Sequence, residues 1–233
     1  MKLLAAVLIT SLSACSDKQE QLPKPVPAEL KTISHVRYLA LGDSYTVGQN
    51  VTIAESFPNQ LSLSLKSSKV QVDELKIIAR SGWTTRDLIE GIKERNFSDS
   101  YDFVTLLIGV NNQYRGESLK TYQEEFKQLL ATAVEYAKGK KERVFVLSIP
   151  DWNATPVGKN ENRMAESIDQ FNAVNKEESI AAGISYIDIT NISRTNSGTE
   201  YVADDGLHPS GKMYSLWVTE LSPVIEMALR TDL

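Results

Sequence analysis

Two short polar segments near opposite ends of the 233-residue chain carry side chains that could act together on a carbonyl carbon. Ser44 follows an apolar run that ends at Leu41, and Asp205 and His208 lie three residues apart near the end of the chain. A serine hydroxyl is a weak nucleophile until a base takes its proton, and histidine suits that task near neutral pH. The spacing lets the Asp205 carboxylate reach Nδ1 of the ring and leaves Nε2 for Ser44. These residues predict a nucleophile, a base and a group that orients the base.

Acyl transfer also needs hydrogen-bond donors for the oxyanion of the tetrahedral intermediate. Three donors are available: the backbone N–H of Ser44 if a helical turn begins there, the N–H of Gly82, and the side-chain amide of Asn111. Plainer explanations stay open, because Gly82 could be a turn glycine and Asn111 with Asn112 could cap a helix.

The elements that must position these residues follow from the pattern of apolar positions. Five apolar runs predict buried parallel strands, at 36–41, 70–79, 103–108, 144–149 and 186–189. Helical patterns separate them, at 58–66, 85–94, 119–137, 162–182 and 210–221, the last of which we expect to end before Pro223. This alternation predicts a single α/β domain with helices on both faces of a parallel sheet. Every candidate residue follows a strand, at the edge where open α/β sheets bind ligands.

Other residues near the strand ends are candidates for a substrate pocket. They are Tyr45, Trp83, Asn112, Trp152 and the loop 113–115. Aromatic side chains at such positions are as often packing residues, so both interpretations stay open. His35 precedes the first strand and is expected at the surface. Because the chain has two separated histidines and one cysteine, we expect no metal site and no cofactor.

The first residues have the pattern of a secretory signal: a charged start, a short apolar run and small residues before Cys15. The stretch 12–15 resembles a bacterial lipobox, which implies removal of 1–14 and acylation of Cys15; a conventional signal or a core cysteine is the alternative. We expect a proline-rich tether over 15–34 and the folded domain over 35–233. No basic stripe is present, so we expect no nucleic-acid partner.

Four short motifs carry a family resemblance. Gly42-Asp43-Ser44, Gly82, Gly109-x-Asn111 and Asp205-x-x-His208 occur in the order of the four sequence blocks of the SGNH, or GDSL, hydrolases. The resemblance implies a flavodoxin-like three-layer α/β/α sandwich with a five-stranded parallel sheet. It also implies Ser44 as nucleophile, His208 as base, Asp205 as its orienter, and Gly82 and Asn111 as oxyanion donors. The third block often reads Gly-x-Asn-Asp, whereas this chain has Asn112. The Gly-x-Ser-x-Gly elbow of the rival serine hydrolase fold is absent, because position 46 is Thr46.

We therefore expect a serine ester hydrolase that acts through an acyl-enzyme on Ser44. The lipobox resemblance implies attachment to the bacterial envelope through lipid on Cys15, on the periplasmic side of the outer membrane. One alternative keeps the triad and acts as an O-acyltransferase or carbohydrate deacetylase, and another is a catalytically idle binding lipoprotein. Acetylated glycans, lysophospholipids, thioesters and short acyl esters present the same carbonyl, so substrate and oligomeric state stay open.

Overall fold

The computed structural model describes residues 34–95, 99–160 and 166–230. The predicted signal peptide, Cys15 and the predicted tether up to residue 33 lie outside the described residues. The last residue of the predicted tether, Ser34, instead begins the first strand of the domain. Among the residues described, no helix combines the length and the apolar composition needed to cross a membrane.

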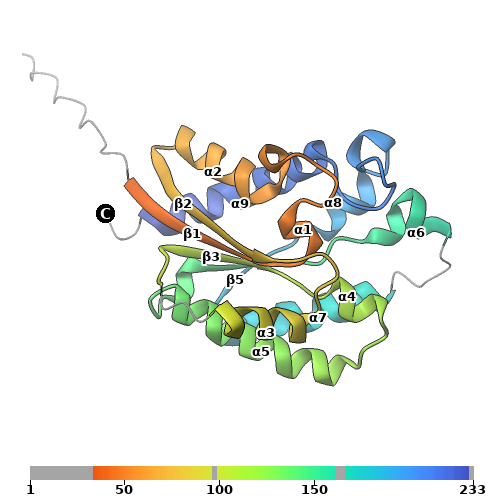
Figure 1. Cartoon of the computed structure of the whole chain (residues 1–233), viewed down its shortest axis with the longest axis horizontal. Coiled ribbons are helices and arrows are strands. Elements are labelled where there is room, and N and C mark those ends of the chain that lie inside the picture. Colours follow the sequence, from red (N-terminus) through yellow and green to blue (C-terminus); the bar gives the residue numbers. More distant parts are fainter. Residues whose placement is uncertain (1–33, 96–98, 161–165, 231–233) are drawn as a thin grey trace, which may run out of the picture. The chain divides into compact units, whose positions relative to one another are not determined.

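A five-stranded sheet forms the centre of the fold (Figure 1). Its strands are β1 (Ser34–Gly42), β2 (Val70–Ala79), β3 (Phe103–Leu107), β4 (Val144–Leu147) and β5 (Ser185–Ile187). All neighbouring strands are parallel, and their spatial order is β2-β1-β3-β4-β5. This confirms the predicted parallel sheet. Because the chain passes from β1 to β2 on one side and then to β3 on the other, the carboxyl end of β1 lies where the strand order reverses, which favours ligand binding there.

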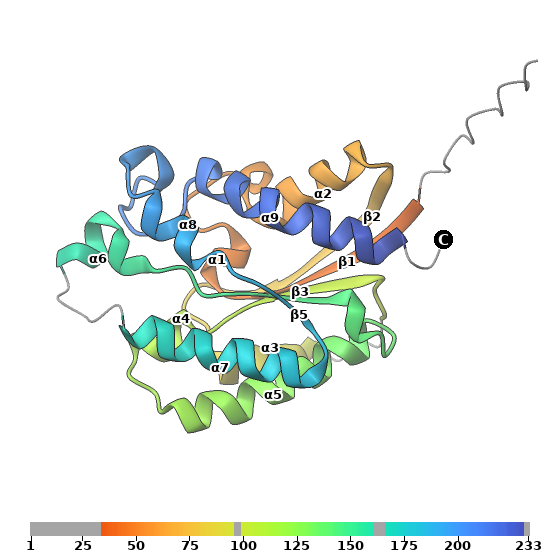
Figure 2. The same cartoon turned by 180° about the vertical axis from the view of Figure 1, so that it is seen from behind.

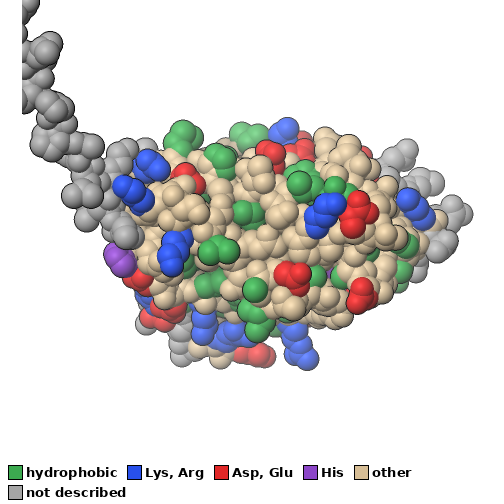
Figure 3. Space-filling model, turned by 90° about the horizontal axis from the view of Figure 1, so that it is seen from above, with side chains coloured by type: hydrophobic (Ala, Val, Ile, Leu, Met, Phe, Trp, Pro, Cys, Tyr) green, Lys and Arg blue, Asp and Glu red, His purple; other side chains and the backbone are tan. Residues whose placement is uncertain are grey.

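Helices cover both faces of the sheet and complete the three layers (Figures 1 and 2). One face carries α2 (Phe57–Ser67) and α9 (Gly211–Arg230), and the other carries α3 (Thr85–Arg95), α5 (Leu119–Tyr136) and α7 (Glu166–Ala182). Short helices lie between the long elements: α1 (Ser44–Val47), η1 (Ile53–Glu55), α4 (Val110–Tyr114), η2 (Lys141–Arg143), η3 (Trp152–Ala154), α6 (Pro156–Asn160), α8 (Thr190–Thr195) and η4 (Thr199–Tyr201). Seen from above, lysines and arginines are scattered among acidic and apolar side chains (Figure 3).

Burial along the strands explains the apolar runs in the sequence. Every residue of β3 and β4 is buried, as expected for central parallel strands that are covered on both faces. The edge strand β2 instead exposes Asp73 and Lys76, and charged side chains on an edge oppose pairing with another chain. The central strands therefore form a rigid platform for the loops at their carboxyl ends.

The last helix differs from the prediction. We expected it to end before Pro223, but α9 continues through Pro223 to Arg230. A proline inside a helix removes one hydrogen bond and crowds the preceding turn. Ile225 and Leu229 lie beyond the proline and are buried with Leu221 in the core, so the burial of this apolar stripe offsets the local cost.

Candidate active site

The candidate nucleophile Ser44 is the first residue of α1, directly beyond the carboxyl end of β1. As a first helical residue it has an N–H without an intrahelical partner, so this N–H is available to a ligand. Asp43 caps the helix by accepting the N–H of Tyr45 at 3.0 Å. Gly42 must be glycine, since a Cβ there would collide with the carbonyl oxygen of Leu107. The strand-to-helix turn therefore holds Ser44 in one place.

Asp43 is fully buried beside the nucleophile. Burial raises the pKa of this carboxyl to about 7, and hydrogen bonds from its own N–H and that of Tyr45 oppose the rise only in part. One carboxylate oxygen, Oδ2, accepts no hydrogen bond from the described residues. This group is thus a capping residue whose charge is costly in the folded state.

Asp205 and His208 form the predicted pair. Asp205 Oδ2 lies 2.5 Å from Nδ1 of His208, and Oδ1 accepts the N–H groups of Leu207 and His208 at 3.0 Å each. Burial raises the pKa of Asp205, but the hydrogen bonds from His208 and Leu207 outweigh it and hold the pKa at about 2. An ionised carboxylate on Nδ1 keeps that nitrogen protonated and leaves Nε2 free to accept a proton.

A cavity of about 350 Å³ brings the candidate residues together. Its lining residues are Ser44, Tyr45, Gln49, Ser81, Gly82, Val110, Asn111, Tyr114, Trp152, Val157, Leu207 and His208. The lining combines apolar side chains from α4, η3, α6 and the turn before His208 with polar side chains from α4 and from the loops after α1 and β2. The predicted nucleophile, base and oxyanion donors thus face one space.

The loop after β2 and the start of α4 supply the other oxyanion donors. Gly82 has φ of +82°, a left-handed conformation that suits glycine. Its carbonyl oxygen accepts a hydrogen bond from Nη2 of Arg115 at 2.6 Å. Nδ2 of Asn111 donates to the carbonyl of Trp83 at 2.9 Å, which orients the amide and leaves its second hydrogen for a ligand. Both residues line the cavity with Ser44. The arrangement can hold negative charge on a substrate oxygen.

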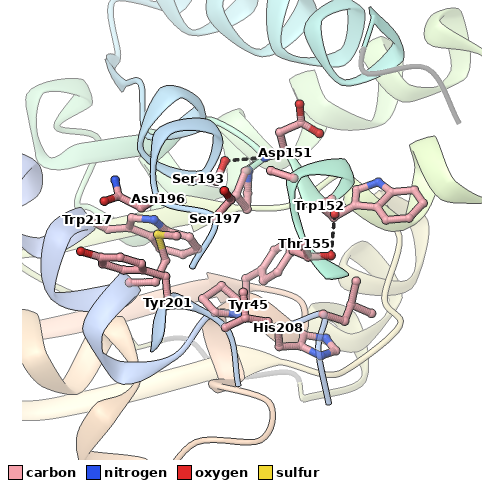
Figure 4. Close-up of a pocket in the computed structure, with 16 residues that line it drawn as sticks. Tyr45, Asp151, Trp152, Thr155, Ser193, Asn196, Ser197, Tyr201, His208 and Trp217 are labelled. Carbon is pink, nitrogen blue, oxygen red and sulfur yellow. Dashed lines mark hydrogen bonds between the residues drawn. The ribbon is translucent and has the colours of Figure 1, made fainter. Parts of the chain in front are cut away.

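Tyr45 and Trp152 also line the cavity, as predicted for pocket residues. Nε1 of Trp152 donates to Oε1 of Gln113 at 3.0 Å, and the indole packs edge-on against Tyr114, with ring centroids 5.6 Å apart. A second cavity of only about 20 Å³ shares Tyr45, Trp152, Leu207 and His208 with the first (Figure 4). It has room for about one water molecule, so any larger ligand must use the first cavity.

Two predicted pocket residues lie elsewhere. Asn112 is fully buried, where it accepts the N–H of Thr85 at 3.1 Å and donates to Thr85 Oγ1 at 2.7 Å and Glu117 Oε2 at 2.8 Å. It joins α4 to the start of α3 and does not line the cavity. Trp83 packs on α3, where a Cβ on Gly91 would collide with its indole. The structure corrects both pocket assignments.

Sequence reasoning missed two residues that follow α1. Ser81 Oγ donates to Oε1 of Gln49, and Nδ2 of Asn50 donates to Oδ2 of Asp205. These contacts join residues 44–51 (the nucleophile segment) to residues 80–83 (the oxyanion loop) and to residues 205–208 (the acid–base turn). In the sequence, Gln49 and Asn50 are marked only by the preceding Gly48, which ends α1 in a left-handed conformation. His35, predicted at the surface, is exposed and contacts Asp73 at 2.9 Å.

Comparisons with known proteins agree with this geometry. Residues 40–216 match the model of the GDSL-like lipase/acylhydrolase family. The chain is 28% identical over 145 residues to YpmR, an uncharacterized protein of Bacillus subtilis (strain 168); the match covers 60% of this chain and 55% of that protein, or little more than half its length.

Solved structures share the fold. TesA aligns with a TM-score of 0.65 and 15% identity, over 82% of this chain and 99% of its own. Axe2, an acetylxylan esterase from Geobacillus stearothermophilus, aligns with a TM-score of 0.63 and 17% identity, over 85% of this chain and 96% of its own. At these identities the likeness concerns the fold alone.

Proposed function

The chain belongs to the GDSL-like lipase/acylhydrolase family, and on that premise we propose that it hydrolyses carboxylic esters through an acyl-enzyme on Ser44. The observation that carries the proposal is the convergence on one cavity of Ser44, His208 and the donors Gly82 and Asn111. Asp205 contacts His208 from behind this lining layer, at 2.5 Å from Nδ1. The name of the structurally similar Axe2, an acetylxylan esterase, supports ester bonds as the substrate class.

The geometry supports a two-step reaction. His208 Nε2 takes the proton of Ser44 Oγ as Oγ bonds to the ester carbonyl carbon, and the carbonyl oxygen becomes an oxyanion. The N–H groups of Ser44 and Gly82 and the amide of Asn111 stabilise that charge. The intermediate then expels the alcohol, which receives the proton from His208. A water molecule, deprotonated by the same ring, attacks the acyl-enzyme, and the acid leaves with Ser44 restored.

The mixture of apolar and polar side chains in the cavity lining suggests how an ester is oriented. We propose that the acyl group packs on the apolar wall formed by Val110, Tyr114, Trp152, Val157 and Leu207. The alcohol then points toward Gln49 and Ser81, where polar groups can solvate it. A series of p-nitrophenyl esters of increasing acyl length tests this orientation, because activity should rise with chain length until the apolar wall is covered.

A fluorophosphonate probe tests the chemistry, since it reacts with an activated serine. The wild-type protein should be labelled, and Ser44→Ala should not. Ser81→Ala is the matched control, because Ser81 lines the same cavity without a base beside it in the proposed mechanism. Labelling that persists in Ser44→Ala would refute the assignment. Product analysis with and without a carbohydrate acceptor separates hydrolysis from O-acyl transfer.

We further propose that the protein is held at the periplasmic side of the bacterial outer membrane by lipid on Cys15. The support is the resemblance of 12–15 to a lipobox and the polar, proline-rich stretch that follows. The wild-type protein should partition into detergent, and Cys15→Ala should lose both acylation and partitioning. Recovery of an unacylated mature protein from the wild-type gene would contradict this proposal.

A further inference from the structure

Backbone hydrogen bonds connect the turn that follows α1 to this helix, which begins at Ser44. The N–H of Gln49 donates to the carbonyl of Ser44 at 3.1 Å, and that of Val51 donates to Gly48 at 3.3 Å. Between them Asn50 has φ of +62°, a left-handed conformation that asparagine adopts more readily than most residues. The position of the Asn50 side chain is therefore coupled to that of Ser44.

The Asn50 amide donates to Oδ2 of Asp205, the same oxygen that faces Nδ1 of His208. The other oxygen, Oδ1, accepts two N–H groups from the Asp205–His208 turn itself. The carboxylate thus has four donors, and the one from Asn50 comes from a segment 155 residues away. It is the one donor among the four that ties the acid–base turn to the nucleophile segment.

We propose that Asn50 is a positioning residue for the reaction, acting through Asp205 and not on the substrate. The terminal torsion of an aspartate is broad, so hydrogen bonds must decide which way its oxygens point. Asn50 holds Oδ2 opposite His208 Nδ1 and so keeps the ring in the Nδ1-protonated tautomer, which leaves Nε2 unprotonated for the base role proposed above. The catalytic consequence rests on the proposed ester hydrolysis, whereas the positioning itself can be measured in the resting protein.

Asp43 is buried beside Ser44 with its pKa raised to about 7, so it titrates in the neutral range in wild type and variants alike. The charge of Asp205 acts on Tyr45 and Tyr214, and burial raises the pKa of both phenols, which therefore stay neutral at working pH. Asp204 precedes Asp205 and is exposed. Because these groups are the same in every variant, the difference in pH profile between Asn50→Asp and wild type reports on the carboxylate added beside the Asp205–His208 pair.

Three variants separate the side chain from the backbone. Asn50→Gly removes the amide and keeps the left-handed backbone, because glycine adopts positive φ at no steric cost. Asn50→Asp keeps the shape and places a second carboxylate beside Asp205. The matched control is Lys69→Gly, since Lys69 has φ of +65°, is exposed and precedes β2 at the opposite end of the sheet from the triad.

Kinetics with a p-nitrophenyl ester give the first measurement. Asn50→Gly should lower kcat about tenfold with KM within about twofold, which is the low end for loss of a hydrogen bond to a charged group. In Asn50→Asp the acid limb of the kcat/KM profile should move to higher pH, because a second negative charge favours the imidazolium. Lys69→Gly should match wild type in both measurements.

Nitrogen NMR of the histidine rings gives the second measurement and needs no turnover. The chain has two histidines, so a His35→Gln background leaves the His208 signals alone. Wild type should show the Nδ1-protonated tautomer, and Asn50→Gly should show a mixture. Identical His208 spectra, a kcat within twofold of wild type, or an equal loss in Lys69→Gly would overturn the proposal. If wild type hydrolyses no ester and Ser44 is not labelled, the proposed function fails and the NMR comparison alone decides the role of Asn50.

Discussion

Alanine substitution at two neighbouring asparagines of α4 should affect different properties of the protein. Asn111 lines the cavity, and its amide donates a single hydrogen bond to the Trp83 carbonyl. Asn112 is fully buried, and its amide makes three hydrogen bonds, to Thr85 and Glu117. We expect Asn111→Ala to slow the reaction and Asn112→Ala to destabilise the fold.

The structure sets the size of each effect. The three hydrogen bonds lost in Asn112→Ala are worth about 1 kcal/mol each, so the free energy of unfolding should fall by about 3 kcal/mol. For a domain of this size that lowers Tm by roughly 6–12 °C. Asn111→Ala loses one such hydrogen bond, so its Tm should fall by only roughly 2–4 °C. As an oxyanion donor, however, Asn111 should contribute about 3–4 kcal/mol to the barrier, so its loss lowers kcat by roughly 10²–10³ with KM nearly unchanged.

Thermal unfolding followed by circular dichroism and steady-state kinetics on a p-nitrophenyl ester measure both quantities on the same samples. At a temperature where both variants are folded, Asn112→Ala should keep kcat within about tenfold of wild type. Equal losses of kcat, or a larger loss in Asn112→Ala, would refute the oxyanion role of Asn111. Asn112→Asp is an informative third variant: it should destabilise the protein, because an aspartate cannot donate to Glu117 and would place two carboxylates together.

Further predictions concern the triad and the buried carboxyl beside it. Ser44→Ala and His208→Ala should each remove nearly all turnover, and the double variant should be hardly worse; additive losses would contradict a joint role. Asp205→Asn should lower kcat by roughly 10⁴, because the amide favours the wrong tautomer of the ring, and near-normal activity would point to another orienting group. Burial raises the pKa of Asp43 to about 7 from 3.8, so its stabilising contribution is complete below about pH 4 and is lost as the pH rises toward 7. Asp43→Asn should therefore flatten the fall of Tm between pH 4 and 8, and an unchanged slope in that variant would refute this reasoning.

The sequence by itself determined the parallel sheet and the residues proposed as nucleophile, base and orienting carboxylate. Strands buried on both faces leave continuous apolar runs, and this is a local pattern that needs no knowledge of the partner strands. The β2 bounds were predicted to the residue, and the order of strand and helix gave the parallel sheet. The Asp205–His208 contact was also predictable, because it closes within one turn of chain.

Only the tertiary structure decided what depends on contacts between distant segments. Whether Asn112 or Asn111 faces the cavity depends on where α3 and Glu117 lie, and a helix can continue through Pro223 because Ile225 and Leu229 find a core to enter. The Asn50–Asp205 hydrogen bond joins residues 155 positions apart. No local propensity encodes such a pairing, since it exists only after the sheet has brought the loops at its carboxyl edge together.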